Sequence, residues 1–143
     1  MARSALEVAV VAGQSLVTQS ESLLAEALSA HHLTYATAQA LWAIAPEEPA
    51  PSMKTVASRL FCNAPNLSFV MNQLAERGLI ERSVDPNDRR SRVVNLTPEG
   101  RRVRSEVIDA ALQVTPLARL TPEELGQFTR LLATALDAPA DAT

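Results

Sequence analysis

Residues 62–100, CNAPNLSFVMNQLAERGLIERSVDPNDRRSRVVNLTPEG, decide the fold of this chain. Between Leu67 and Leu74, apolar residues recur at i, i+3, i+4 and i+7, which is the spacing of one buried stripe on an α-helix. Gly78 follows at the place where a left-handed C-cap favours a residue without Cβ. The pattern predicts a helix over about residues 64–77 whose opposite face is polar and almost uncharged.

A cluster of turn residues comes next, at residues 85–88, between two segments rich in β-branched residues, 79–84 and 91–96. This arrangement predicts a β-hairpin with a basic tip at about residues 84–92. A helix with a polar outer face followed directly by a basic hairpin is the pattern of a winged helix-turn-helix.

Two shorter helices are expected in front of the 64–77 helix. Thr34 has the position of an N-cap for a helix over residues 35–45, which would bury Trp42 and end before the proline-rich residues 46–51. Ser52 would cap the next helix, residues 53–60. A turn then leads into the helix that reads outward, with Asn63 as its N-cap.

The two ends of the chain are also helical in pattern. Residues 4–29 carry a long apolar stripe, with a possible loosening at Gly13, and Thr97 and Thr121 begin two further helices at capping threonines followed by proline. Because one small domain does not bury such terminal helices alone, we expect an interface between two copies, although a core helix of a monomer is the alternative.

The predicted fold class is therefore mostly α with a small β-hairpin wing: a winged helix-turn-helix domain plus terminal dimerisation helices. We expect a single domain over residues 1–143. Its parts are a DNA-binding lobe at 33–97 and a helical dimerisation lobe made of 1–32 and 98–143.

Charge is distributed unevenly along the chain. The net charge is −3, but residues 52–104 hold ten Lys/Arg against five Asp/Glu, which gives +5 and leaves −8 for the rest. A basic segment on an acidic scaffold is typical of a nucleic-acid binder, because phosphate contacts supply much of the binding free energy.

Composition excludes several other classes. A single cysteine, Cys62, excludes an internal disulfide, and the adjacent His31 and His32 do not have metal-ligand spacing. No apolar run is long enough to span a bilayer and no signal-peptide pattern opens the chain, so we expect a cytoplasmic protein with no membrane partner. There is no catalytic triad order, phosphate loop or carboxylate cluster, so we expect neither an enzyme nor a cofactor.

The sequence resembles the MarR (multiple antibiotic resistance regulator) family of bacterial transcription factors. The resemblance covers residues 33–104 in motifs and the whole chain in helix order. Its specific part is Leu74-x3-Gly78-Leu79-Ile80-x-Arg82, then Asp85-x2-Asp88-Arg89-Arg90, then Val94-x-Leu96-Thr97-x2-Gly100. It implies a homodimer built from the first, fifth and sixth helices, which binds a double-stranded, pseudo-palindromic operator, usually as a repressor. Many members release DNA when a small phenolic ligand or an oxidant acts on them.

Candidate DNA-binding residues lie on the 64–77 helix and in front of it. The amides of Asn66, Asn72 and Gln73 could pair bidentately with adenine, and Ser68 suits a phosphate or a base edge. Phe69 either packs on thymine methyl groups or covers the edge of the core; both remain open. Pro65 completes this face. Three more candidates lie at the start of the preceding helix: Ser52, Lys54, Thr55. Either the free N–H groups of this helix end hold a phosphate, or these residues simply cap the helix.

In the wing, Arg90 is expected to enter the minor groove, whose narrow form has an enhanced negative potential. Arg89 and Arg92 are expected at phosphates. The alternative for Arg90 is a solvated hairpin charge paired with Asp88. Asp88 itself is expected to orient an arginine and not to contact the DNA. Three further arginines form either an ordinary solvated face or a flank beside the DNA: Arg101, Arg102, Arg104.

The resemblance also implies a ligand pocket between the dimerisation helices and the DNA-binding lobe. By helix order the candidate lining residues are His31, His32, Tyr35, Trp42. Cys62 has two interpretations, an oxidant sensor or a buried small hydrophobe, and the second is favoured because nearby positive charge is not evident. At the level of the whole protein, the alternative function is a winged-helix protein-interaction module that does not bind DNA.

Overall fold

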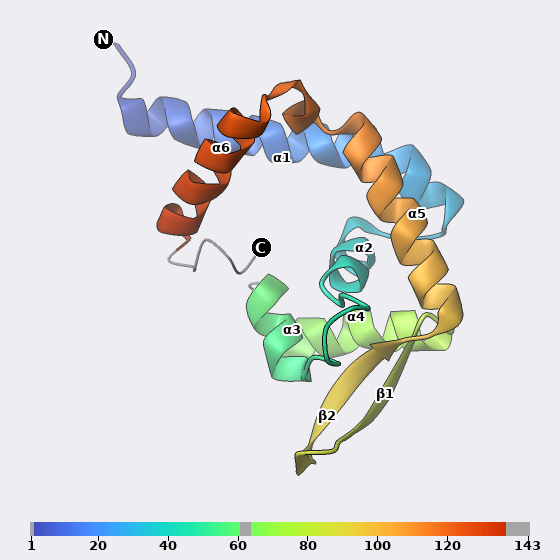
Figure 1. Cartoon of the computed structure of the whole chain (residues 1–143). Coiled ribbons are helices and arrows are strands. Elements are labelled where there is room, and N and C mark those ends of the chain that lie inside the picture. Colours follow the sequence, from blue (N-terminus) through green and yellow to red (C-terminus); the bar gives the residue numbers. More distant parts are fainter. Residues whose placement is uncertain (1, 61–63, 137–143) are drawn as a thin grey trace.

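The structure is a computed structural model, and it describes residues 2–60 and 64–136, with the side chains of residues 64 and 65 excepted. Figure 1 shows α1 at one end of the molecule, the hairpin at the other, and α5 running between them. In chain order the elements are α1 (Ala5–Ala30), α2 (Tyr35–Trp42), α3 (Met53–Leu60), α4 (Ala64–Glu76), β1 (Ile80–Asp85), β2 (Asp88–Leu96), α5 (Pro98–Val114), the 3-10 helix η1 (Pro116–Arg119) and α6 (Pro122–Ala135). The predicted fold class is confirmed.

Capping residues set where several helices begin. The Thr34 hydroxyl accepts the N–H of Thr37 at 3.2 Å, and Thr37 returns a bond to the N–H of Thr34 at 2.9 Å. At α6, Thr121 and Glu124 form the same reciprocal box. The predicted N-cap roles of Thr34 and Thr121 are therefore confirmed. In both boxes the partner residue lies three positions further along the chain.

Several boundaries differ from the prediction. Helix α2 ends at Trp42 and not at residue 45, because Ala45 precedes Pro46 and that position disfavours the helical region. Trp42 is 39% exposed, so its predicted burial in the core is wrong. The first helix passes through Gly13 without a break. The short helix η1 was not foreseen after α5.

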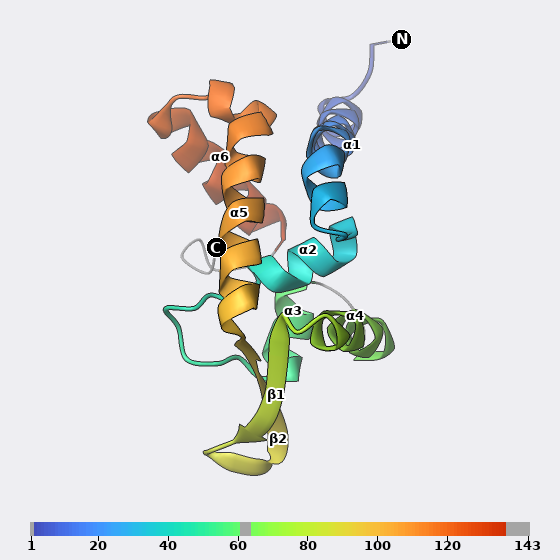
Figure 2. The same cartoon turned by 90° about the vertical axis from the view of Figure 1, so that its right-hand side faces the viewer.

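The hairpin is longer than predicted and is tied to the chain before α3. Strand β2 already begins at Asp88, which leaves only residues 86 and 87 between the antiparallel strands. Val94 donates its N–H to the Pro51 carbonyl at 2.9 Å, and Ser52 forms an isolated bridge with Val93. Figure 2 shows the hairpin extending beyond the helices, with its tip farthest from them.

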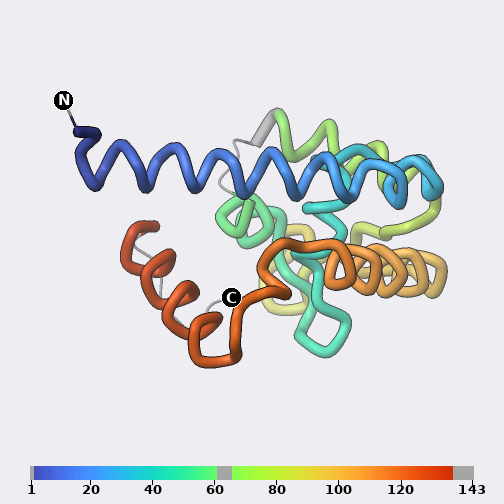
Figure 3. The backbone as a smooth tube through the Cα atoms, turned by 90° about the horizontal axis from the view of Figure 1, so that it is seen from above, coloured from blue at the N-terminus to red at the C-terminus, as the bar shows by residue number. Residues whose placement is uncertain are grey.

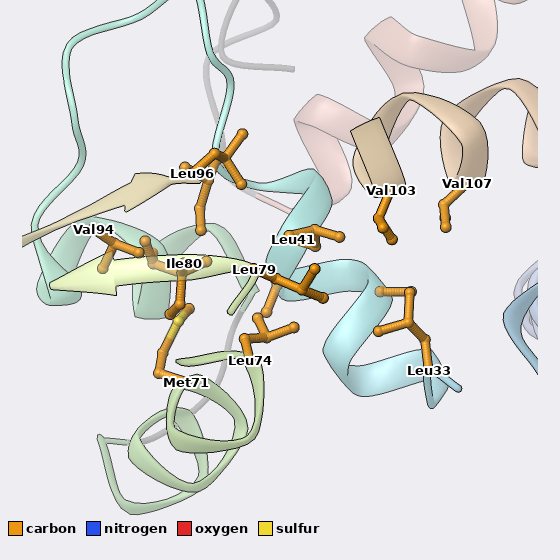
Figure 4. Packing of buried hydrophobic residues seen from close by; sticks show 14 of the residues in the cluster. Leu33, Leu41, Met71, Leu74, Leu79, Ile80, Val94, Leu96, Val103 and Val107 are labelled. Carbon is orange, nitrogen blue, oxygen red and sulfur yellow. The ribbon is translucent and has the colours of Figure 1, made fainter. Parts of the chain in front are cut away.

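The core joins the α2–α4 unit to the hairpin and α5. Leu41, Met71, Leu74 and Val94 are fully buried, and Figure 4 shows side chains of α2, α4, both strands and α5 converging on one cluster. Gly78 ends the α4 segment with φ +71°, which confirms the predicted left-handed cap. The core therefore fixes the orientation of α4 relative to the hairpin.

The terminal helices are packed much less completely. The first half of α1 projects away from the lobe of α2–α4, and α6 lies on the same side of the molecule (Figures 1 and 3). Large apolar side chains are exposed there, including Leu6, Val10, Val17, Leu131, Leu132 and Leu136. No helix in the described part of the chain is long and apolar enough to cross a membrane.

Candidate nucleic-acid interface and effector pocket

One face of α4 is buried and the opposite face is open. Leu67, Met71 and Leu74 lie in the core, as the stripe predicted. Phe69 is 64% exposed, so it does not cover the core edge, and this settles the question that the sequence left open. The amide and hydroxyl candidates share this outer side: Asn66, Ser68 and Asn72 are exposed and Gln73 is half-buried. Pro65 begins this face, but its side chain lies outside the described residues.

The wing presents three exposed arginine side chains, Arg89, Arg90 and Arg92. Asp88 accepts the backbone N–H of Arg90 at 3.0 Å, so its carboxylate stabilises the turn and forms no ion pair with the Arg90 guanidinium. Within the described residues these three guanidinium groups make no hydrogen bond or ion pair, which leaves their donors available. The alternative in which the Arg90 side chain pairs with Asp88 is therefore wrong, and the carboxylate holds the Arg90 backbone instead.

The start of α3 is occupied by its own cap. Ser52 is half-buried and its hydroxyl accepts the N–H of Thr55 at 3.1 Å, while the two hydroxyl groups lie 2.9 Å apart. Lys54 is exposed and forms no hydrogen bond or ion pair with the described residues. The capping interpretation of Ser52 and Thr55 is thus satisfied within the chain, and Lys54 is the one of the three that keeps a free charge among the described residues.

Arg82 was not among the sequence candidates, although it belongs to the site. Its Nη1 donates to Oδ1 of Asn72 at 2.8 Å, which joins β1 to the outer face of α4. Ten residues separate the two, with a helix end and a turn between them. No periodic pattern links such positions, so the pair becomes visible only in the folded chain.

Other cations of the basic segment hold the structure together. Arg59 donates to the Ala43 carbonyl at 2.7 Å and Arg104 donates to the Trp42 carbonyl at 2.9 Å. Arg77 donates from Nη1 to the His32 carbonyl at 2.6 Å, and from Nη2 to the His31 carbonyl. Only part of the +5 charge is therefore presented outward.

Arg102 is also committed inside the chain. It pairs with Glu99 and Glu106 on its own helix, and the hydrogen bond from Arg102 lowers the pKa of the Glu99 carboxyl. The same bonds, first that to Glu99, raise the pKa of the guanidinium. The predicted flank of Arg101, Arg102 and Arg104 thus reduces to Arg101 as the exposed arginine without a described partner.

A cavity of about 470 Å³ lies between the terminal helices and α2. Tyr35 and Trp42 line it, as expected, but His31 and His32 do not. His31 instead contacts Glu106, with Nε2 at 3.2 Å from Oε2, and His32 borders a separate hollow of about 430 Å³ with Tyr35. The remaining lining residues of the larger cavity are Ser20, Leu24, Ala38, Gln39, Val107, Ala111, Leu112, Val114, Thr115, Leu117, Ala118 and Leu125.

Known proteins share this arrangement. A sequence model of the MarR family matches residues 31–91, which contain α2, α3, α4 and most of the wing. Over these residues the chain matches the MarR family. The organic hydroperoxide resistance transcriptional regulator of Bacillus subtilis strain 168 is 23% identical over 121 residues, covering 85% of this chain and 80% of that protein.

Solved structures of MarR-type regulators agree over nearly the full length. PcaV of Streptomyces coelicolor, in complex with its natural ligand, has 28% identity and a TM-score of 0.70, covering 96% of this chain and 99% of that one. BpsR of Bordetella bronchiseptica, whose DNA binding is regulated by 6-hydroxynicotinic acid, has 26% identity and a TM-score of 0.77, covering 97% and 100%. The family match and these structures together support a DNA-binding transcriptional regulator.

Proposed function

We propose that this MarR-family regulator is a homodimeric, ligand-responsive repressor of a pseudo-palindromic operator. One observation carries the proposal: the open face of α4 adjoins a wing whose three arginines have no partner among the described residues. An exposed helix of this kind fits the major groove, and a basic hairpin beside it reaches the adjacent minor groove. Two copies would place two such units on successive half-sites.

The residues divide into readers and anchors. Arg90, exposed near the tip of the hairpin, enters the minor groove, and Arg89, Arg92 and Lys54 contact phosphates. Phe69 packs on thymine methyl groups, which suits an apolar ring held outward on a polar face. The other proposed contacts on this face come from Pro65, Asn66, Ser68, Asn72 and Gln73, with Ser52 and Thr55 bordering it.

The wing assignment is tested with the DNA upstream of the protein's own gene and fluorescence anisotropy over a range of salt concentrations. Arg90→Ala should weaken binding by about 1–3 kcal/mol and reduce the salt slope by roughly one unit. Arg102→Ala is the matched control, because its charge is already paired on α5.

Equal binding by the wild type and Arg90→Ala would contradict the wing assignment. Complete absence of salt-dependent binding to any duplex would instead favour the alternative, a winged-helix module that binds protein. We propose neither enzymatic activity nor a cofactor, since the family is one of transcriptional regulators.

The effector is proposed to bind the 470 Å³ cavity. Its lining holds two aromatic rings and no Lys, Arg, His, Asp or Glu among the described residues. A neutral aromatic compound with a hydroxyl group therefore fits better than a carboxylate, which would be desolvated without a cation. Titration of the operator complex with a phenol and with the matching benzoate tests this: release by the benzoate alone would contradict the proposed ligand class.

A further inference from the structure

We propose that Asn72, held by Arg82, reads guanine in the operator as a hydrogen-bond donor, and this inference rests on the proposed binding of α4 in the major groove. The starting point is one contact. Nη1 of Arg82 donates to Oδ1 of Asn72 at 2.8 Å, from β1 to the outer face of α4. Both side chains are exposed, so the pair lies at the surface that would meet DNA.

The contact fixes which end of the amide faces outward. A guanidinium group has donors and no acceptor, so only the oxygen of the Asn72 amide can face Arg82. Nδ2 then points away from Arg82, and it has no hydrogen-bond partner among the described residues. Asn72 is therefore presented to solvent mainly as an N–H donor.

This orientation changes the base that Asn72 selects. An unrestrained asparagine pairs with adenine by accepting from N6 and donating to N7. Here that acceptor already serves Arg82, and the N6 amino group of adenine would be brought beside a guanidinium cation. The N4 amino group of cytosine meets the same repulsion. Guanine instead offers two acceptors, O6 and N7, to the donor and to the positive charge behind it.

The position of Asn72 on the helix supports a direct contact. It lies three residues after Phe69, on the side opposite Leu67 and Met71, which are buried. Residues at i and i+3 are neighbours on a helix surface. Phe69 and Asn72 would thus read neighbouring bases, the ring on a thymine methyl group and the amide on a guanine. Arg82 acts through Asn72 and is a positioning residue for this readout.

The test is a selection from a randomised duplex library with the full-length protein, followed by affinity measurements on the selected site with each base substituted in turn. The wild type should favour guanine over cytosine roughly ten-fold at one symmetric pair of positions. Asn72→Asp keeps an acceptor for Arg82 but removes the donor, so this preference should vanish while the far-ultraviolet circular dichroism is unchanged.

Arg82→Met is the second variant, because it frees the amide oxygen. The preference at the same positions should then move from guanine towards adenine. Asn95→Asp is the matched control: it makes the same chemical change at an exposed residue of β2 outside the proposed contacts, so it should leave the preference at those positions intact.

Two results would overturn the inference while leaving the regulator a DNA binder. One is a base profile of Asn72→Asp that equals the wild type at every position, which would make the pair purely structural. The other is a wild-type preference for adenine that Arg82→Met does not alter. If the wild type enriches no sequence at all, the proposed operator binding fails, and this outcome differs from both.

Discussion

Gly100 is the residue at which a single methyl group should matter most. It lies in the first turn of α5, where its N–H donates to the Thr97 hydroxyl at 2.9 Å. A Cβ at this position would be 1.9 Å from the carbonyl oxygen of Leu79, which is backbone and cannot move aside alone. The glycine of the family motif is therefore needed for the close approach of α5 to the chain entering β1.

Gly100→Ala should lower the free energy of unfolding by about 3 kcal/mol or more, because overpacking against a fixed backbone forces the helix start away from Leu79. Urea unfolding followed by circular dichroism measures the change. Ser105→Ala, at an exposed position of the same helix, serves as the control and should change stability by only a few tenths of a kcal/mol, roughly. Similar midpoints for the two variants would contradict the packing argument.

Glu124 gives a pH dependence at the scale of one carboxyl group. The N–H of Thr121, bonded to Oε1 at 3.0 Å, lowers the pKa of Glu124 below its ordinary value of 4.5. A lowered folded-state pKa means that the bond stabilises the protein above about pH 4.5 and that this stabilisation is lost as the pH falls through the folded-state value.

Comparison with Glu124→Gln isolates that contribution, because glutamine can accept the same N–H but cannot titrate. The wild type should exceed the variant in urea midpoint at pH 6 by an amount that disappears at pH 3. A gap between them that stays constant over this range would show that ionisation of Glu124 does not contribute.

At the scale of elements, Arg77 joins the end of α4 to the turn between α1 and α2. Its guanidinium donates hydrogen bonds to the carbonyls of His31 and His32. His32 has a positive φ of 55°, a conformation that is costly for a residue with a Cβ. The same turn is held from α5 by the contact between His31 and Glu106. The orientation of α4 is thus tied to α1 and α5 by this turn, in addition to the core that they share.

Arg77→Met should reduce the free energy of unfolding by about 1 kcal/mol, since exposed bonds from a charged donor contribute near the lower end of their range. Amide hydrogen exchange at residues 31–33 should also accelerate. Arg101→Met is the control, as Arg101 is exposed with no partner among the described residues. Exchange at the turn that matches the wild type would contradict the proposed role of Arg77 as the link.

Local signals explain which elements could be predicted from the sequence. The caps at Thr34, Thr121 and Gly78 depend on residues within four positions, so pattern alone placed them. The exposure of Trp42 and the pairing of Arg82 with Asn72 depend on elements distant in sequence. The outer face of α4 was therefore predictable as a surface, whereas the partner of each side chain on it was not.

At the scale of the whole molecule, the apolar surface is distributed between the two ends very unequally. The lobe of α2–α4 and the hairpin buries most of its large apolar side chains, with Trp42, Phe69 and Val84 as exceptions, whereas the terminal helices expose Leu6 by 75% and Leu131 by 71%. Figure 3 shows these helices on one side of the molecule. MarR-family regulators are dimers, and this exposed apolar surface is the part of the subunit that a second copy would cover.

Leu131→Glu should therefore dissociate the dimer while leaving the isolated subunit folded. The side chain is already exposed within the subunit, so the substitution removes few internal contacts, but in a dimer it would bury an unpaired charge. Sedimentation velocity at micromolar concentration should show monomers, and operator affinity should fall by at least ten-fold, because one subunit holds only one half-site. Ala36→Glu, at an exposed position of α2, is the control for added charge and should stay dimeric. A dimer that survives both Leu131→Glu and Leu6→Glu would place the subunit interface elsewhere, and the spacing of the two reading helices would then have to be set by a different surface.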